Sequence, residues 1–504
     1  AGTDTITVGG NISLTDSIDG GAGTDTVNAE LDTATVHQFG TLTGVEVLNL
    51  DYTAAGTFKA NGIAPTVINM TVSDGAATAA VINNVGSGIQ IDLEEDDLNG
   101  VTIDYTADAT ATIRLATGTT VDAGNLVVTD AQTVTLQSHG GADHALGAVT
   151  LDSKDTDTLI ISTAATGSDL VQTGAFAADD VKDVTITAAK DNSTISLGVG
   201  STFLATADLL QTLTISATAE NDGDVTITTL GGTAAAAALQ TISITASADA
   251  TIASATGADV TTGIIDAAGA DLTSITLAAN YTGSIVTVGA GGADDILADS
   301  VATITVSAVT GAEVDVQGGV DITTIGQLTA SGGGTIRFDN SDNDTATLER
   351  VDSTVTGTFI ADFNQTTDVV TYTLGSGTNT ITTGTANDVV YLKAAGGTDD
   401  IALSTSDTGS ITIHNFQVGA SADDIILSAT GLDAGTGATQ HVNSDDATDV
   451  FTNADAVVVT EYSAAVDFDN ATADTNISQV AGDFTDNTAL ISALSSGLRH
   501  GNHL

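Results

Sequence analysis

The chain of 504 residues contains no cysteine, no tryptophan, one proline and only nine basic residues. Without cysteine it forms neither disulfide bonds nor thiolate metal sites, so any cross-link that stabilises the fold must be of another kind. Sixty-five acidic residues give a formal net charge of −56, which excludes nucleic acid as a natural partner and disfavours docking on an anionic membrane. No apolar run approaches the ~20 residues of a membrane-spanning helix, so we expect no transmembrane segment.

Signatures of catalysis are also missing. The sequence has no G-x-S-x-G, H-E-x-x-H or Walker lysine motif, and its seven histidines are scattered. Aromatic residues make up 3 % of the chain, which is few for the stacking platforms of sugar-binding clefts. We therefore expect a protein that is not an enzyme. A carbohydrate-active hydrolase built on a β-solenoid is the least favoured alternative.

The residues that are abundant favour strands and turns. Hydrophobic residues make up 41 %, the mean hydropathy is +0.22, and 54 glycines accompany many Thr, Val, Ile and Asp residues. This composition predicts an all-β fold of short strands that buries a core. Self-repulsion among the acids predicts a neutralising cation, and Ca²⁺ is the simplest, since it takes carboxylate and carbonyl oxygens. The alternative is an acidic surface that is merely solvated.

A repeat of the form φ-x-x-φ-[Thr/Ser]-φ-x-Ala, with φ aliphatic, runs through the middle of the chain. Its copies begin 29, 29, 33 and 29 residues apart, at Val181, Leu210, Leu239, Leu272 and Val301. The alternation is that of a strand with one buried face, and near-constant spacing lets each unit stack on the next. The alanine slot predicts a crowded position between neighbouring units. We predict a parallel β-solenoid with β-roll-like repeats, with leucine-rich repeats or tandem β-sandwich domains as alternatives.

Three regions follow from the distribution of motifs. Residues 1–60 hold a glycine–aspartate turn region, residues 61–335 the strand repeats, and residues 336–504 a second glycine–aspartate region with a polar tail. The chain opens at Ala1 like the second half of a turn-and-strand motif, which indicates a processed or truncated form.

The sharpest motif is Gly20-Gly-Ala-Gly-Thr-Asp-Thr-Val27, which matches the nonapeptide pattern G-G-x-G-x-D-x-U-x. Glycines such as Gly21 and Gly23 permit a tight turn whose carbonyls point inward, and Asp25 supplies a hard carboxylate oxygen. We predict a calcium site here, to which Asp4 and Asp16 add oxygens from adjacent turns.

Weaker copies and acidic loops predict further calcium ligands. One copy, with shifted glycines, contains Gly292, Asp294 and Asp295. A C-terminal series contains Asn379, Asp388, Gly397, Asp399, Asp400, Asp423 and Asp424. An acidic loop contains Asp339, Asp342 and Asp344, without the glycine and distal glutamate of an EF-hand. A plain acidic loop is the equal alternative for this last cluster.

On residues 16–28 and 375–428, the chain resembles the RTX family of bacterial proteins, whose nonapeptides form calcium-loaded β-rolls. Its composition is similar to that of the RTX-type surface-layer (S-layer) proteins of Gram-negative bacteria. The resemblance implies type I secretion, calcium-dependent folding outside the cell, and self-assembly into a two-dimensional lattice on the cell surface, anchored by a surface polysaccharide or lipopolysaccharide. The chain departs from the family in having one perfect nonapeptide rather than a consecutive stack. A secreted calcium-binding adhesin or matrix protein is the alternative.

Overall fold

The computed structural model forms two compact units, unit 1 (Ala1–Ala270) and unit 2 (Asp271–Leu504). It describes residues 2–10, 12–33, 35–71, 79–94, 100–115, 121–151, 156–204, 209–218, 223–231, 237–247, 259–289, 296–316, 320–339, 347–393, 397–403, 411–415 and 423–427, with three short strands beyond them.

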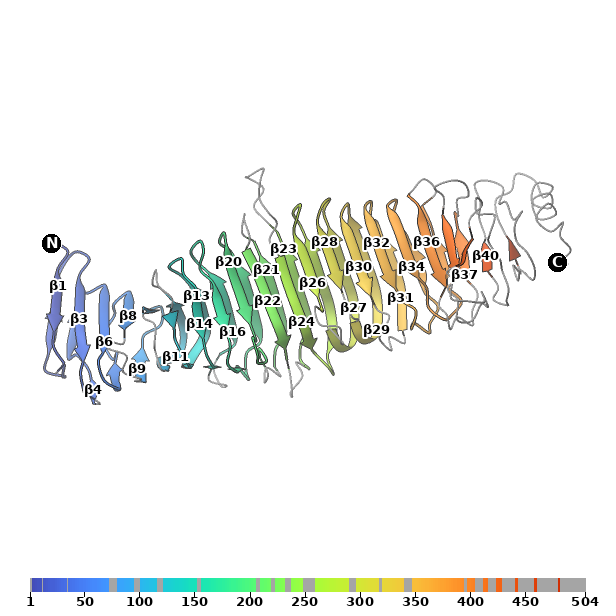
Figure 1. Cartoon of the computed structure of the whole chain (residues 1–504). Coiled ribbons are helices and arrows are strands. Elements are labelled where there is room, and N and C mark those ends of the chain that lie inside the picture. Colours follow the sequence, from blue (N-terminus) through green and yellow to red (C-terminus); the bar gives the residue numbers. More distant parts are fainter. Residues whose placement is uncertain are drawn as a thin grey trace. The chain divides into compact units, whose positions relative to one another are not determined.

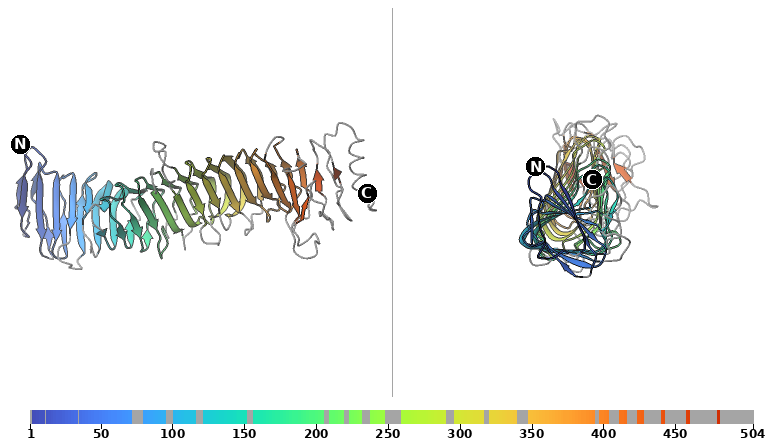
Figure 2. Two further views of the ribbon diagram at one scale, coloured as in Figure 1. Left: turned by 45° about the horizontal axis from the view of Figure 1, so that its top comes forward. Right: turned by 90° about the vertical axis from the view of Figure 1, so that its left-hand side faces the viewer.

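The fold is all-β, as the composition predicts, and each unit is built as a parallel β-solenoid. No helix occurs among the described residues. Within each unit, strands of successive coils lie side by side (Figure 1). Parallel pairing between such strands joins backbone donors and acceptors of adjacent coils at a spacing of ~4.8 Å. Figure 2 shows the same coils from two further directions.

The described residues of unit 1 form three ladders of parallel strands. Ladder A joins β1 (Thr5–Val8), β3 (Thr26–Leu31), β6 (Val47–Tyr52), β8 (Val67–Thr71), β10 (Gln90–Leu93), the C-terminal halves of β11 (Val101–Leu115) and β13 (Leu126–Ser138), β16 (Thr158–Thr163), β19 (Asp183–Ala188), β21 (Thr212–Ala217) and β23 (Thr241–Ala246). Ladder B joins β4 (Val36–His37), β7 (Gly56–Lys59), β9 (Ala80–Val85), the N-terminal halves of β11 and β13, β15 (Val149–Leu151) and β18 (Phe176–Ala177). Ladder C joins β12 (Val121–Asp122), β14 (His144–Leu146), β17 (Leu170–Gln172), β20 (Ser193–Leu197), β22 (Gly223–Leu230) and β24 (Asp259–Asp266). A separate pair is β2 (Ser17–Asp19) with β5 (Thr41–Thr43).

Unit 2 contains two ladders. Ladder D joins β25 (Asp271–Ala279), β27 (Ile296–Ala308), β29 (Val320–Gly332), β31 (Thr347–Ser353), β33 (Thr371–Thr373), β35 (Val389–Tyr391), β37 (Ile411–His414), β40 (Val457–Val459) and β41 (Gln479–Val480). Ladder E joins β26 (Ile285–Val288), β28 (Glu313–Val316), β30 (Thr335–Asp339), β32 (Thr358–Asp362), β34 (Thr378–Thr382), β36 (Asp399–Leu403) and β38 (Asp424–Leu427). The antiparallel pair of β38 with β39 (Gln440–Val442) departs from this pattern.

The sequence repeat corresponds to strands of ladders A and D. Its five copies form β19, β21, β23, β25 and β27, in which aliphatic residues point inward and Thr or Ser points outward. The alanine slot is an interior position, because Ala188, Ala217 and Ala246 lie opposite one another in the register and are fully buried, and its crowding stays a prediction.

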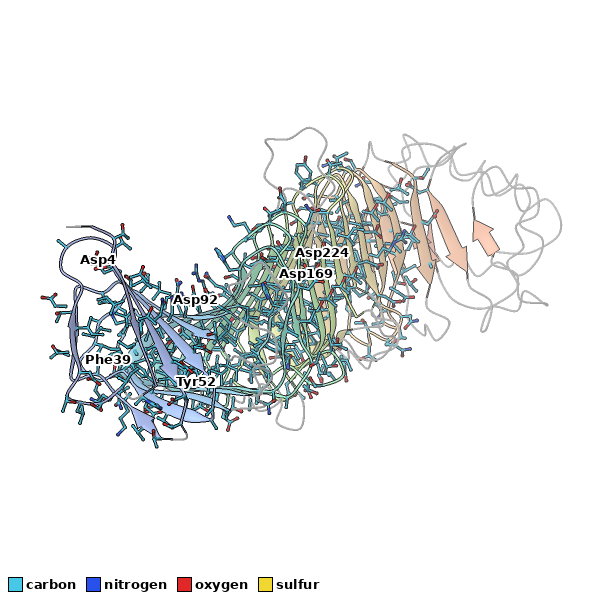
Figure 3. All side chains as sticks on the ribbon, turned by 60° about the vertical axis from the view of Figure 1, so that its left-hand side comes forward. Asp4, Phe39, Tyr52, Asp92, Asp169 and Asp224 are labelled. Carbon is cyan, nitrogen blue, oxygen red and sulfur yellow. The ribbon has the colours of Figure 1, made fainter. Side chains whose placement is uncertain are left out.

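Large side chains fill the interior of the coils elsewhere. Phe176 and Phe203 pack edge to face with ring centroids 4.9 Å apart. Phe39 and Tyr52 are buried in the first coils (Figure 3), and the Tyr52 hydroxyl donates to the carbonyl of Val81 at 2.9 Å. Full burial of each such side chain contributes about 1.5–3 kcal/mol.

Among the described residues, strands pair in parallel from coil to coil. This pairing is that of the predicted β-solenoid and differs from that of tandem β-sandwiches. Strands on two or three sides of each coil, without helices in the described ranges, also distinguish it from a leucine-rich repeat. The boundaries predicted at residues 60 and 335 rest on motif content. The division into two structural units does not test them, so they stay a prediction.

Candidate functional site

The nonapeptide Asp25 lies in a column of acidic residues at the start of ladder A. Strand pairing places Asp4, Asp25 and Glu46 at equivalent positions of three successive coils, 21 residues apart. Asp25 Oδ1 accepts the backbone N–H of Asp4 at 2.7 Å, and Glu46 Oε2 accepts the N–H of Asp25 at 2.8 Å. Each carboxylate therefore bonds the backbone of the preceding coil.

Glycines let the turns of these coils approach closely. A Cβ atom at Gly23, whose φ is +148°, would lie 1.8 Å from the carbonyl oxygen of Gly2. A Cβ at Gly20 would lie 2.1 Å from the carbonyl oxygen of Gly44 and 3.0 Å from Asp25 Oδ2. Only glycine fits at these two positions without moving the backbone, which accounts for the glycines of the motif.

The second oxygen of Asp25 has an unusual environment. Asp25 is fully buried, and its Oδ2 has no hydrogen-bond partner. A buried, unpaired carboxylate oxygen is costly, and a hard cation beside it would remove that cost. The residues present therefore fit a Ca²⁺ ion, which Asp25 Oδ2 and turn carbonyls such as that of Gly44 would hold. When bound, the ion would neutralise the carboxylate and cross-link two turns.

The structure does not join Asp16 to this column. Its Oδ2 accepts the backbone N–H of Ser13 at 2.7 Å and so closes its own exposed turn. Gly21, with a φ of +86°, lies in the turn before Asp25, and its N–H donates to Asp19 Oδ1 at 3.2 Å. Of the predicted N-terminal ligands, Asp4 and Asp25 are thus brought together, and Asp16 is not.

A second polar column lies inside ladder E of unit 2. Asn379, Asp399 and Asp423 occupy equivalent positions of three coils, and each is at most 1 % exposed. Asn379 Nδ2 donates to Asp399 Oδ1 at 2.6 Å, and the N–H of Asp399 donates to Asp423 Oδ1 at 3.2 Å. Asn379 Oδ1 has no hydrogen-bond partner. One coil earlier, the same position is filled by the buried ring of Phe359.

Burial dominates the protonation of this column. It raises the pKa of Asp399 to about 7, because the charged form loses its solvation, and the negative charge of Asp423 raises it further. Hydrogen bonds from Asn379 act in the opposite direction and are weaker. A proton or a cation on Asp399 therefore stabilises the column near neutral pH.

Asp388 repeats the inter-coil bond in a different ladder. This residue is buried just before β35, where its Oδ1 accepts the N–H of Val370 at 2.8 Å and its Oδ2 accepts that of Gly384 at 3.1 Å. Val370 is the equivalent residue one coil earlier. In Asp25, Glu46, Asp388 and Asp423 alike, a carboxylate before a strand accepts the N–H of the preceding coil. We call these four contacts the inter-coil carboxylate bonds.

The remaining predicted ligands lie apart from these columns or outside the described residues. Gly397 packs against the carbonyl of Gly377, and Asp400 points outward from ladder E. Asp339 lines a shallow groove of about 300 Å³ with Asp315, Arg337 and Asp362. Gly292, Asp294, Asp295, Asp342 and Asp344 lie outside the described residues, as does the side chain of Asp424.

Within the described ranges, no group of three or more His, Cys, Asp or Glu side chains is placed to hold a metal ion. A calcium ion at Asp25 would consequently complete its six to eight oxygens with carbonyls and water. Those ranges also contain no helix that is long and apolar enough to cross a bilayer.

Glu46 was missed by the sequence analysis, although its 21-residue spacing from Asp25 was a visible signal.

Comparison with known proteins adds no relative: a scan against family models, a search of curated proteins and a search of solved structures each found no match.

Proposed function

We propose that this chain is a structural, non-catalytic protein of the bacterial cell surface that associates with copies of itself into a calcium-dependent two-dimensional lattice. The observation that supports the proposal most is the regular solenoid, whose coils present equivalent side chains in register along each ladder. A surface that repeats a pattern offers many equivalent contacts to a second copy. Heterologous contacts between identical chains extend into arrays when the rotation does not close.

Calcium is part of the proposal because of the net charge of the chain. A chain of net charge −56 repels its own copies, and exposed charges act over about 8 Å at physiological salt. The buried, unpaired Oδ2 of Asp25 and the column at Asp399 offer oxygen ligands to a hard cation. Calcium would order these turns and lower the repulsion between chains, which monovalent salt can only screen.

The location follows from the same reasoning and from the resemblance to S-layer proteins. An extracellular protein without cysteine needs another source of stability, and millimolar external calcium would supply it. We propose type I secretion and a surface polysaccharide or lipopolysaccharide as the anchor. Binding of the purified protein to cells stripped of their surface layer, and to cells lacking the polysaccharide, tests the anchor.

Electron microscopy and light scattering of the purified chain test the assembly. We expect monomers in chelator, ordered sheets on addition of calcium, and no sheets in sodium chloride at matched ionic strength. A monodisperse monomer at high protein concentration in calcium contradicts the lattice and favours a secreted adhesin or matrix protein. Glycan hydrolysis by a chain that remains monomeric would favour the β-solenoid hydrolase.

A further inference from the structure

One part of unit 1 presents almost no charge on its outer surface. Between β11 and β23, ladder A presents three outward residues per strand, and strand pairing aligns them in three rows. The rows are Thr110, Thr133, Thr158, Asp183, Thr212 and Thr241; Thr112, Thr135, Ile160, Thr185, Thr214 and Ser243; and Arg114, Gln137, Ser162, Thr187, Ser216 and Thr245. We name these 18 side chains the hydroxyl face. None of them is buried.

The composition of the hydroxyl face differs from that of the whole chain. Eleven of its residues are threonine and three are serine, and its two charged residues, Arg114 and Asp183, have opposite signs. Its formal charge is therefore 1 − 1 = 0, in a molecule of net charge −56. An average stretch of 18 residues of this chain carries a formal charge of about −2, so the hydroxyl face is less acidic than the chain as a whole.

The same ladder is acidic before this face begins. Outward residues of the earlier coils include Glu30 on β3 and Asp51 on β6, while Asp92 on β10 lies in the same row but is buried against Arg114. Arg114 pairs with Asp92 through Nε and Nη2 of its guanidinium group, with Nε 2.8 Å from Oδ1, and so marks the edge of the neutral area. The acid residues near the later strands lie at their ends, where Asp157 pairs with Lys182.

Small side chains on a regular ladder make this face suitable for close contact. Strands repeat every ~4.8 Å, and the outward residues of one strand repeat every two residues, or ~6.6 Å. Thr187 Oγ1 and Ser216 Oγ are 3.0 Å apart, so these hydroxyls bond along the face. Away from Asp183, two such faces can interdigitate without burying an unpaired charge, as identical side chains do in dry interfaces between sheets.

We propose that the hydroxyl face is the surface through which two copies of this chain meet. The inference rests on the self-association proposed above and identifies the surface that makes the contact. A second copy is the occupant because the repulsion between two such acidic chains is least where neither presents net charge. The face measures roughly 29 Å by 17 Å, about 500 Å², from six strands and five residues along each. A stable pair usually buries about 800 Å² on each partner, so this contact alone is weak and becomes effective in an array.

A pair of variants with the same charge change separates the hydroxyl face from the rest of the surface. Thr185→Glu with Thr214→Glu places two carboxylates in its middle row, on β19 and β21. Ser196→Glu with Thr226→Glu places two carboxylates on ladder C, outward, in the same two coils. Light scattering against protein concentration in calcium measures assembly. We expect the first variant to need at least tenfold more protein to assemble, and the second to stay within about twofold of wild type.

A charge-reversal test identifies the partner surface. Thr185→Lys with Thr214→Lys should also fail to assemble alone, because two positive faces repel. Mixed with the double-glutamate variant, it should assemble again, since opposite faces attract. Far-UV circular dichroism and thermal melting confirm that each variant is folded, and Thr185→Ser with Thr214→Ser provides a conservative variant that should assemble normally.

The outcomes distinguish the two proposals. Wild type that stays monomeric in calcium contradicts the lattice, and the hydroxyl-face contact with it. Wild type that assembles while the folded Thr185/Thr214 glutamate variant assembles equally well overturns the hydroxyl face alone. Equal loss of assembly in both glutamate variants also overturns it, because added charge anywhere would then suffice. Failure of the mixture to assemble contradicts a contact between two hydroxyl faces.

Discussion

Asp25 has a structural task that does not depend on a cation, since its Oδ1 accepts the N–H of Asp4 from the preceding coil. Its Oδ2 is the atom left for calcium. The sequence predicted the residue as a ligand but not this hydrogen bond, because the bond depends on a coil length that one isolated nonapeptide does not reveal. The register becomes visible only when Asp4, Asp25 and Glu46 are read together at their spacing of 21.

Two substitutions of Asp25 separate these roles. Asp25→Ala removes both oxygens, and we expect it to lower the free energy of unfolding by about 1.5–3 kcal/mol in chelator, the usual contribution of a hydrogen bond to a charged group. Asp25→Asn keeps an acceptor for the Asp4 N–H but removes the charge, so it should lose the gain in stability that calcium provides at this site. Denaturant titrations in chelator and in calcium measure both.

Glu30→Gln is the matched control, because it removes one charge from an exposed position on the neighbouring strand β3. It should retain the full calcium response. If Asp25→Asn responds to calcium as wild type does, the carboxylate serves only the inter-coil carboxylate bond, and Asp25 is not a ligand.

Asp399 should make stability depend on pH in the opposite sense to an ion-paired aspartate. Its pKa is raised from 3.8 to about 7, so between these values the folded chain holds a proton that the unfolded chain has released. The contribution of this residue to stability in chelator is greatest below about pH 4, and it falls by about 2–4 kcal/mol as pH rises to about 7. Asp399→Asn should remove that contribution, as unfolding titrations across this range would show. An unchanged pH profile in the variant would place the titration elsewhere.

At the scale of strands, the sequence was most informative where each coil repeats the same pattern. β19, β21 and β23 combine buried aliphatic residues, outward Thr or Ser, and a buried alanine, and this alternation identified them. Ladders B and C were not predicted individually. Several of their strands are short, with only two or three residues in β15, β17 and β18, and turns of different lengths separate them, so no fixed spacing marks them.

The alanine slot gives a prediction for one strand. Ala217 is fully buried between Ala188 and Ala246 of the adjacent coils, so Ala217→Leu must displace packed neighbours. We expect a loss of about 1–3 kcal/mol in the free energy of unfolding. Ser216→Leu, one residue earlier and outward, should change it by at most about 0.5 kcal/mol. Equal effects of the two substitutions, measured by denaturant titration, would mean that the slot is not tightly packed.

For the whole molecule, the fold and the charge make opposing contributions to the stability of the folded chain. Parallel ladders bury aliphatic residues in every coil, while 65 acidic residues repel one another along the same coils. The inter-coil carboxylate bonds use part of this charge inside the structure, because a carboxylate that accepts a backbone N–H is stabilised as the anion. Most acids lie outside such bonds and depend on the solution for neutralisation.

Calcium should therefore raise the melting temperature of the chain by more than ionic strength explains. A ligand that binds only the folded state stabilises it by RT ln(1 + [L]/Kd), or about 4 kcal/mol at a thousandfold excess over Kd, and separate sites add. Sodium chloride acts only by screening, so at matched ionic strength it should recover a minor part of the increase. Melts in chelator, calcium and sodium chloride, at a protein concentration below assembly, measure the two contributions separately. Equal melting temperatures in calcium and in matched sodium chloride would show that cations act on this chain through screening alone, and the predicted calcium sites would then be acidic turns without a bound ion.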